Sequence, residues 1–225
     1  MRHWTLLGEA SIPGSDKVLS LHQGKDDFFI RISGEGELMN TRTHGSEDAL
    51  GALPCERLPD TKKAQVLIGG LGMGFTLAAV LANVGDKARV TVAELIPEVV
   101  EWNHGPLGAR SGYPLNDPRT DVFIGDVATL LKDACRRYDV IALDVDNGPE
   151  GMTKSSNSWL YSTAGIIAAQ KSLSPTGILA YWSAAQDAGF HDRLRRCGFL
   201  VDEVMVRGHG KKGPKHYIWL ASISG

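Results

Sequence analysis

A glycine-rich turn constrains the fold of this chain more than any other feature. Residues 66–76 read VLIGGLGMGFT, with Gly70, Gly72 and Gly74 at alternate positions after an apolar run. This pattern predicts a strand, a tight turn and the first turn of a helix. Glycine is needed because the turn takes backbone angles that a Cβ disfavours and because the backbone approaches a ligand closely. A simpler alternative is that the glycines only join the strand to the helix.

A carboxylate follows the next predicted strand. Residues 89–93 form a second β-type run that ends in Glu94. An acid at this place accepts hydrogen bonds from both hydroxyls of a ribose, so a nucleoside-containing cofactor is predicted. The alternative is a solvated residue that precedes the helix starting at Pro97. The turn alone fits either an NAD-type or an S-adenosylmethionine-type site, and Leu77, where a further glycine is absent, favours the second.

Two more acids follow later strands. Asp126 comes after the run FIGDV, and Asp144 ends the run YDVIALD. Ligands of open α/β sheets bind beyond the carboxyl ends of the strands, so Glu94, Asp126 and Asp144 are expected to converge on one crevice. Asp126 also suits the N-cap of a helix over residues 127–136, and the two roles are compatible. Asp144 could instead be structural, in which case it needs a partner.

These segments together resemble a known family. The order VLIGGLGMG, AELIPEVVEW, DPRTDVFIGDVATLL, YDVIALDVDNGP, the pair Leu160-Tyr161 and LSPTGILAYW is similar to that of the spermidine synthase (polyamine aminopropyltransferase) family, a branch of the class I methyltransferase fold, over residues 64–185. The resemblance implies that Glu94 holds the ribose, Asp126 the adenine amino group, and Asp144 the position that deprotonates or orients an attacking amine. The cofactor-binding residues that it implies are Gly70, Gly72, Gly74, Glu94, Leu95, Asp126, Val127 and Asp144.

The substrate side departs from the family pattern. Gly72 occupies the slot of the aspartate that grips the amine of decarboxylated S-adenosylmethionine. Asn147 replaces a carboxylate that binds a polyamine ammonium, and Asp146 is displaced by one position. The segment His44 to Asp48, HGSED, stands where another polyamine contact is expected. Because a buried ammonium needs carboxylates, these departures favour methyl transfer slightly over aminopropyl transfer.

We therefore expect an enzyme, a spermidine synthase-like transferase that uses S-adenosylmethionine or its decarboxylated form. The expected reaction is methyl transfer to a small-molecule nucleophile; the alternatives are a polyamine aminopropyltransferase and a non-catalytic interaction module. Asp144 is the expected catalytic residue, assisted by Asp146. Asn147, Tyr161 and His44 are expected at the substrate side, where residues 148–158 (GPEGMTKSSNS) would form a gate loop.

Composition restricts the partners. The 225 residues include 43% hydrophobic and 22% charged residues, and a net charge of −2 gives no general attraction to nucleic acid or to a membrane surface. A small-molecule substrate is expected, and a homodimer is possible. No metal site or disulfide framework is expected, because the cysteines and histidines lack the spacing for either; they include Cys55, Cys135, Cys197, His44, His104, His209 and His216. The first residues contain no long apolar run, so a cytoplasmic location is expected.

The expected fold is α/β: a Rossmann-like class I methyltransferase sandwich with a mostly parallel seven-stranded sheet, a C-terminal antiparallel hairpin and a small N-terminal β lobe. Residues 1–50 are predicted to form that lobe as a meander, and residues 51–225 the S-adenosylmethionine-binding domain. A short helix is expected between residue 45 and Pro59. The predicted strands are 65–69, 89–93, 121–124, 138–144, 177–182, 199–206 and 216–222, and the predicted helices are 74–83, 97–103, 127–136, 159–173 and 187–196.

Overall fold

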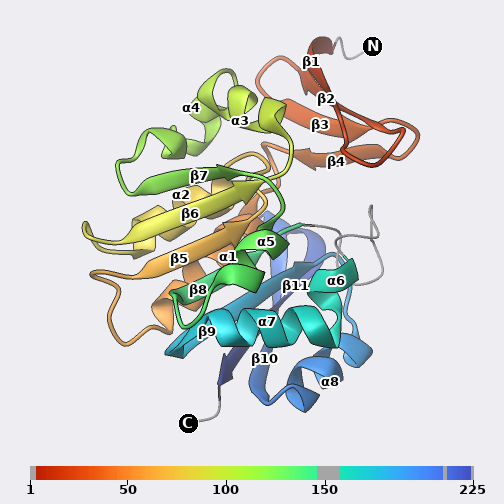
Figure 1. Cartoon of the computed structure of the whole chain (residues 1–225). Coiled ribbons are helices and arrows are strands. Elements are labelled where there is room, and N and C mark those ends of the chain that lie inside the picture. Colours follow the sequence, from red (N-terminus) through yellow and green to blue (C-terminus); the bar gives the residue numbers. More distant parts are fainter. Residues whose placement is uncertain (1–3, 146–157, 210–211, 224–225) are drawn as a thin grey trace.

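The chain folds into two sheets of different size (Figure 1). The computed structural model describes residues 4–145, 158–209 and 212–223. The smaller sheet is an antiparallel meander, as the sequence predicts, with strands in the order of the chain. Its strands are β1 (Thr5–Ser11), β2 (Val18–Gln23), β3 (Phe28–Ile32) and β4 (Gly36–Asn40).

The larger sheet has seven strands in the order β10-β11-β9-β8-β5-β6-β7. Five neighbouring strands are parallel, whereas β11 is antiparallel to both β9 and β10. The mostly parallel sheet and the C-terminal hairpin confirm the predicted fold class. The strands are β5 (Gln65–Gly69), β6 (Arg89–Glu94), β7 (Thr120–Ile124), β8 (Tyr138–Leu143), β9 (Leu173–Ser183), β10 (Phe199–His209) and β11 (Lys212–Ile223).

Helices cover both faces of this sheet. Figure 1 shows α5 and α7 in front of it and α1 and α2 behind it. Alternate residues of each strand point to opposite faces, so Val66 and Ile68 pack in one core cluster and Leu67 in the other. The helices are α1 (Gly45–Glu56), α2 (Phe75–Asn83), α3 (Pro97–His104), α4 (Gly108–Ser111), the 3-10 turn η1 (Pro114–Asn116), α5 (Val127–Asp133), α6 (Ser158–Tyr161), α7 (Thr163–Ser172) and α8 (Ala188–Arg196).

The element bounds differ from the predictions at several places, including β10, which extends to His209, and β11, which starts at Lys212. The single helix predicted over 159–173 is two helices, because Ser162 is extended and its hydroxyl caps α7 by accepting from the Gly165 N–H at 3.2 Å. Strand β9 starts at Leu173 rather than 177, since it already pairs there with Tyr138. Helix α5 ends at Asp133, where the chain turns extended at Ala134. The short elements α4 and η1 were not predicted.

Helix α1 connects the two predicted units. It runs across the boundary predicted at residues 50/51 and packs against α2 and against β9 and β10 of the large sheet. The boundary therefore stays a prediction, and the helix itself packs with the second unit. None of the helices in the described ranges is long and apolar enough to cross a membrane.

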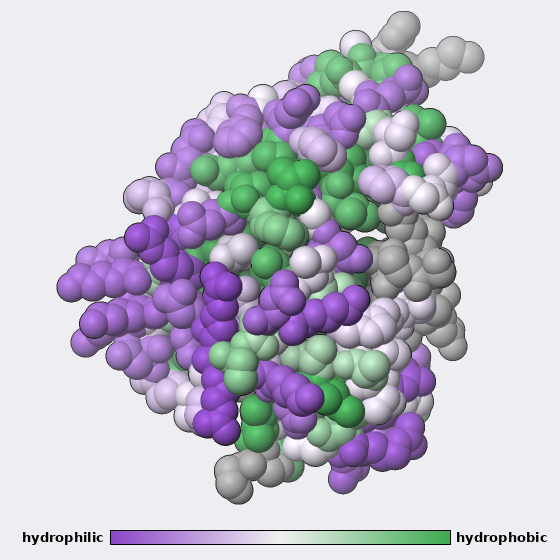
Figure 2. All heavy atoms as spheres, in the orientation of Figure 1, coloured by the Kyte–Doolittle hydropathy of each residue, from purple (hydrophilic) through white to green (hydrophobic). Residues whose placement is uncertain are grey.

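The outer edge of the large sheet leaves some apolar side chains in solvent. Figure 2 shows apolar residues gathered near β7, where Val122 and Ile124 are 38% and 49% exposed. Charged and polar side chains surround this patch. The enclosed hollows lie instead at the carboxyl ends of the strands, beside the N-terminal sheet.

Candidate active site

The glycine-rich turn packs against the end of β8. Gly70, Gly72 and Gly74 have φ angles of +94°, +53° and +82°, which residues with a Cβ rarely adopt. A Cβ on Gly70 would also lie 2.2 Å from the carbonyl oxygen of Asp144. The prediction that this turn requires glycine is confirmed, and Gly70 sets how closely the turn approaches the strand that ends in Asp144.

Glu94, the last residue of β6, holds the glycine turn in place. Its two carboxylate oxygens accept hydrogen bonds from the N–H groups of Leu71 and Ile96, each at 2.9 Å. The side chain is only 8% exposed, so the alternative of a solvated residue is wrong. Burial raises the pKa of Glu94, while the backbone hydrogen bonds lower it. Each carboxylate oxygen can accept more than one hydrogen bond, and ribose binding by Glu94 stays a prediction.

Asp126 is the N-cap of α5. Its carboxylate accepts a hydrogen bond from the Ala128 N–H at 2.8 Å. The residue also lines a cavity, so the capping role and the predicted ligand role are compatible in this structure.

The predicted cofactor residues meet around one hollow. A cavity of about 160 Å³, which we call the strand-end cavity, lies beyond the carboxyl ends of β5, β6 and β7. Ile32, Leu38 and Met39 of the N-terminal sheet form its opposite wall. The predicted residues that line it are Gly70, Gly72, Glu94, Leu95, Asp126, Val127 and Asp144. The three acids therefore converge as the strand order implies.

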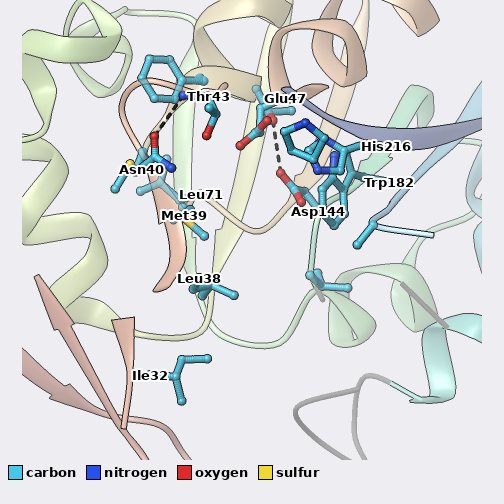
Figure 3. A pocket seen from close by; sticks show the side chains of 17 residues that line it. Ile32, Leu38, Met39, Asn40, Thr43, Glu47, Leu71, Asp144, Trp182 and His216 are labelled. Carbon is cyan, nitrogen blue, oxygen red and sulfur yellow. Dashed lines mark hydrogen bonds between the residues drawn. The ribbon is translucent and has the colours of Figure 1, made fainter. Parts of the chain in front are cut away.

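A second cavity, of about 330 Å³, continues from the first. We call it the carboxylate cavity, because Glu47 of α1 and Asp144 both line it. Figure 3 shows the carboxyl group of Glu47 pointing toward that of Asp144. The residues shared by the two cavities are Ile32, Leu38, Met39, Gly72, Asp144 and Val145. A ligand can therefore extend from one cavity into the other past Gly72 and Asp144.

Asp144 is poorly solvated for a carboxylate. Burial and then the negative charge of Glu47 raise the pKa of Asp144 to about 7, against a smaller lowering by Thr76. The Thr76 hydroxyl donates to Asp144 Oδ2 at 3.5 Å, a long and weak hydrogen bond. A carboxylate with a pKa near neutrality can accept a proton and release it again at physiological pH.

Glu47 is held at the start of α1. The Ser46 hydroxyl donates a hydrogen bond to Glu47 Oε2 at 2.6 Å. Burial raises the pKa of Glu47, whereas this hydrogen bond lowers it. Two facing carboxylates with raised pKa values favour a bound cation, which stabilises both charged forms. The cavity is thus suited to an ammonium group.

Aromatic residues from two strands complete the carboxylate cavity, in addition to Phe75 of α2. Trp182 of β9 and His216 of β11 line it, with ring centroids 4.9 Å apart. Burial lowers the pKa of His216, which favours the neutral form of its imidazole. His216, considered from the sequence only for metal binding, is thus one of the residues that line a cavity.

The other predicted substrate residues lie elsewhere. His44 stacks on Phe75 at 4.0 Å and its Nδ1 lies 2.8 Å from Asp48 Oδ2; its side chain is not among those that line either cavity. Tyr161 is 3% exposed and packs against Tyr181 and Phe190 in the core. Neither His44 nor Tyr161 lines either cavity, so the structure does not place them at the expected substrate side. Asp146, Asn147 and all of the predicted gate loop except Ser158 lie outside the described residues.

Glu47, Trp182 and His216 were not predicted as site residues. Glu47 lies within the segment HGSED, and the place of this segment at an expected polyamine contact was the available signal. Trp182 and His216 come from different strands, and nothing in their spacing along the chain connects them. Within residues 4–145, 158–209 and 212–223, no three His, Cys, Asp or Glu side chains are grouped to hold a metal ion.

Solved structures share this fold over nearly the whole chain. A spermidine synthase in complex with the transition state analogue AdoDATO superposes with a TM-score of 0.73 at 18% identity, covering 97% of this chain and 72% of that one. The spermidine synthase of Thermotoga maritima gives a TM-score of 0.74 at 17% identity, with the same coverage. At these identities the likeness shows the fold alone.

Curated relatives are similar over shorter stretches. The polyamine aminopropyltransferase of Corynebacterium efficiens is 32% identical over 111 residues, which are 48% of this chain and 21% of that protein. Putrescine N-methyltransferase 2 of Nicotiana attenuata is 29% identical over 153 residues, which are 64% of this chain and 38% of that protein. The chain thus spans well under half the length of these relatives.

A family model decides the classification. The model described as the spermine/spermidine synthase domain matches residues 44–191, a stretch that includes the glycine turn, Glu94, Asp126 and both cavity carboxylates. This stretch is more than half of the 225 residues. The chain therefore belongs to the family of the spermine/spermidine synthase domain.

Proposed function

We propose that this protein transfers an aminopropyl group from decarboxylated S-adenosylmethionine to an amine. The observation that carries the proposal is the facing pair Glu47 and Asp144 in a cavity continuous with the strand-end cavity. The sequence alone favoured methyl transfer, because Gly72 removes a carboxylate from the glycine turn. Glu47 lines the same cavity as Gly72 and supplies a carboxylate from α1 instead. Family membership and relatives named as polyamine aminopropyltransferases support the same choice.

The residues divide the work between the two cavities. Glu94, Asp126 and the glycine turn would hold the adenosine part, and Gly72 would leave room for the sulfonium at the shared wall. The sulfonium supplies an electrophilic carbon when the donor is bound. Asp144 would take the proton from the acceptor ammonium, so that its nitrogen forms a bond to that carbon while the bond from carbon to sulfur breaks. Asp144 then returns the proton to solvent, and methylthioadenosine leaves.

Positioning and proton removal are the two contributions that this arrangement supports. Alignment of two bound reactants lowers the barrier by reducing the entropy cost of their encounter. A base with a pKa of about 7 is half ionised near neutral pH, where an amine needs to lose its proton.

The product separates the candidates. The protein is incubated with decarboxylated S-adenosylmethionine or S-adenosylmethionine and a panel of primary amines, and nucleoside products are resolved by chromatography. Methylthioadenosine together with an aminopropylated amine supports the proposal. Release of S-adenosylhomocysteine with a methylated amine contradicts it. A reaction that requires no amine would also contradict it.

Methyl transfer to an amine is the second candidate, and Gly72 is the observation that favours it. No carboxylate at position 72 repels the carboxylate of ordinary S-adenosylmethionine, and relatives named as putrescine N-methyltransferases are similar over 153 residues. Gly72→Asp distinguishes the two donors, because a carboxylate here would attract the free ammonium of decarboxylated S-adenosylmethionine and repel the carboxylate of S-adenosylmethionine. Aspartate tolerates a positive φ better than most residues, but its Cβ would lie 3.3 Å from Met39 Sδ, a tight contact that requires the flexible Met39 side chain to shift. We expect this variant to bind decarboxylated S-adenosylmethionine more tightly relative to S-adenosylmethionine, as measured by calorimetry.

A further inference from the structure

Two residues that line the carboxylate cavity each have a buried nitrogen atom with no hydrogen-bond partner within the described part of the chain. The two atoms are Trp182 Nε1 and His216 Nδ1. Figure 3 shows the two rings beside Asp144, on the same side of the cavity as Glu47. Buried polar groups are nearly always satisfied in native proteins, so an exception at a cavity wall needs an explanation.

The chemistry of the two nitrogens restricts what can satisfy them. An indole N–H donates and cannot accept, so its partner must be an acceptor. In its neutral form, which burial favours, His216 Nδ1 is either a donor or an acceptor, depending on the tautomer. A second ammonium group carries donors only, so it cannot bond to Trp182 Nε1. Glu47 and Asp144 therefore suit a bound cation, whereas Trp182 Nε1 suits an oxygen that accepts a hydrogen bond.

We propose that the carboxylate cavity selects a ligand that carries an ammonium group and also an oxygen that accepts hydrogen bonds, such as a hydroxyl or a carboxylate. The ammonium lies against Glu47 and Asp144, and the oxygen accepts from Trp182 Nε1, assisted by His216. This inference rests on the proposed transfer to an amine, and it names the acceptor as an amino alcohol or an amino acid rather than a diamine. The amino acid part of S-adenosylmethionine also carries both an ammonium group and a carboxylate, so the donor could supply these groups in place of the acceptor.

Binding measurements on acceptors of equal length test the proposal. Calorimetry compares 4-amino-1-butanol, 4-aminobutanoate and 1,4-diaminobutane, each in the presence of methylthioadenosine to fill the strand-end cavity. We expect at least one of the two oxygen-containing ligands to bind about tenfold more tightly than the diamine, as the loss of one hydrogen bond to a buried group implies. Trp182→Phe keeps an aromatic ring and removes the N–H, so this preference should fall to near unity.

Matched variants control the comparison. Trp4→Phe makes the same chemical change on the N-terminal sheet, where Trp4 stacks on Phe29 outside both cavities, and should leave the preference unchanged. His216→Phe removes both ring nitrogens of the histidine, including the unpartnered Nδ1. This variant should also reduce the preference for oxygen-containing ligands, as Trp182→Phe does. Thermal unfolding of each variant shows whether the fold is retained.

The donors distinguish the two sources of the oxygen. If Trp182→Phe weakens S-adenosylmethionine relative to its decarboxylated form but leaves the acceptor series unchanged, the oxygen belongs to the donor, and the shared chemistry stands. If Trp182→Phe changes neither series, or if the diamine binds best to the native protein, the proposal is overturned. Because these are binding measurements, an absence of group transfer with every amine would contradict the proposed function without changing this result.

Discussion

The two connected cavities differ in how their polar groups are satisfied. In the strand-end cavity, Glu94 accepts two backbone N–H groups and Asp126 caps α5. In the carboxylate cavity, Asp144 has one long hydrogen bond from Thr76, and Trp182 Nε1 is unsatisfied within the described residues. The first set is fixed by its own backbone, whereas the second set would gain partners from the ligand that we propose. Binding residues on the first side are therefore also structural, and those on the second side are free to react.

The largest expected effect tests the reactive side. Asp144→Asn keeps the shape of the side chain but cannot take a proton, so turnover should fall by roughly 10² to 10⁴, the usual contribution of a positioned base. Affinity for methylthioadenosine should change by only a few-fold. Steady-state rates and calorimetry on the same preparation measure both. A variant that turns over normally would make Asp144 structural and remove the contrast between the two cavities.

The next effect tests the structural side. Glu94→Ala removes the acceptor of two buried N–H groups, those of Leu71 and Ile96, which costs about 1–3 kcal/mol for each group. Adenosine affinity should also fall, by roughly tenfold to a hundredfold, for a lost charged hydrogen bond to ribose worth roughly 1.5–3 kcal/mol. Urea unfolding and methylthioadenosine titration separate the two losses. Glu94→Gln, which keeps one acceptor oxygen, is the control. Unchanged nucleoside affinity in Glu94→Ala would contradict the cofactor assignment.

A smaller effect sharpens the role of Glu47. The ionised form of Asp144 is the base, so the rate should rise with pH through the Asp144 pKa of about 7. The charge of Glu47 raises that pKa, and Glu47→Gln removes the charge. The midpoint of the rise should therefore move to lower pH, and the amine should bind less tightly because one carboxylate is lost. The pH dependence of kcat/KM, which reports the pKa of the free protein, measures the shift. An unchanged midpoint would mean that the two carboxylates do not interact.

The smallest effect separates capping from binding at Asp126. Asp126→Ala removes the hydrogen bond to the Ala128 N–H and should lower the free energy of unfolding by about 1 kcal/mol. Asp126→Asn keeps a capping oxygen, so its stability should stay close to that of the native protein. Both variants should weaken adenosine derivatives if Asp126 contacts the adenine amino group. Equal nucleoside affinity in all three proteins would leave Asp126 as a cap only.

The local pattern of the sequence was sufficient to predict the side of the strand-end cavity that the strand ends form, but not the opposite wall that the N-terminal sheet forms. Glycines at 70, 72 and 74, and acids at the ends of three strands, are signals within short segments, and a parallel sheet brings such strand ends to one edge. Helix bounds were less predictable, since the break at Ser162 depends on a side-chain cap within an otherwise helical run. The convergence of Glu94, Asp126 and Asp144 was therefore predictable without a structure.

The carboxylate cavity depends on the tertiary structure. Glu47 comes from α1, Trp182 from β9 and His216 from β11, and the order of the strands in the sheet places them together. His44 and Tyr161 show the converse, because their positions in the sequence suggested a substrate contact and packing placed one on Phe75 and the other in the core. The sequence by itself determined the α/β class, the glycine turn and the acids at the strand ends, since each depends on neighbouring residues. Only the tertiary structure decided which side chains face Asp144, because burial, and with it a pKa near 7, depends on elements that are distant in the chain.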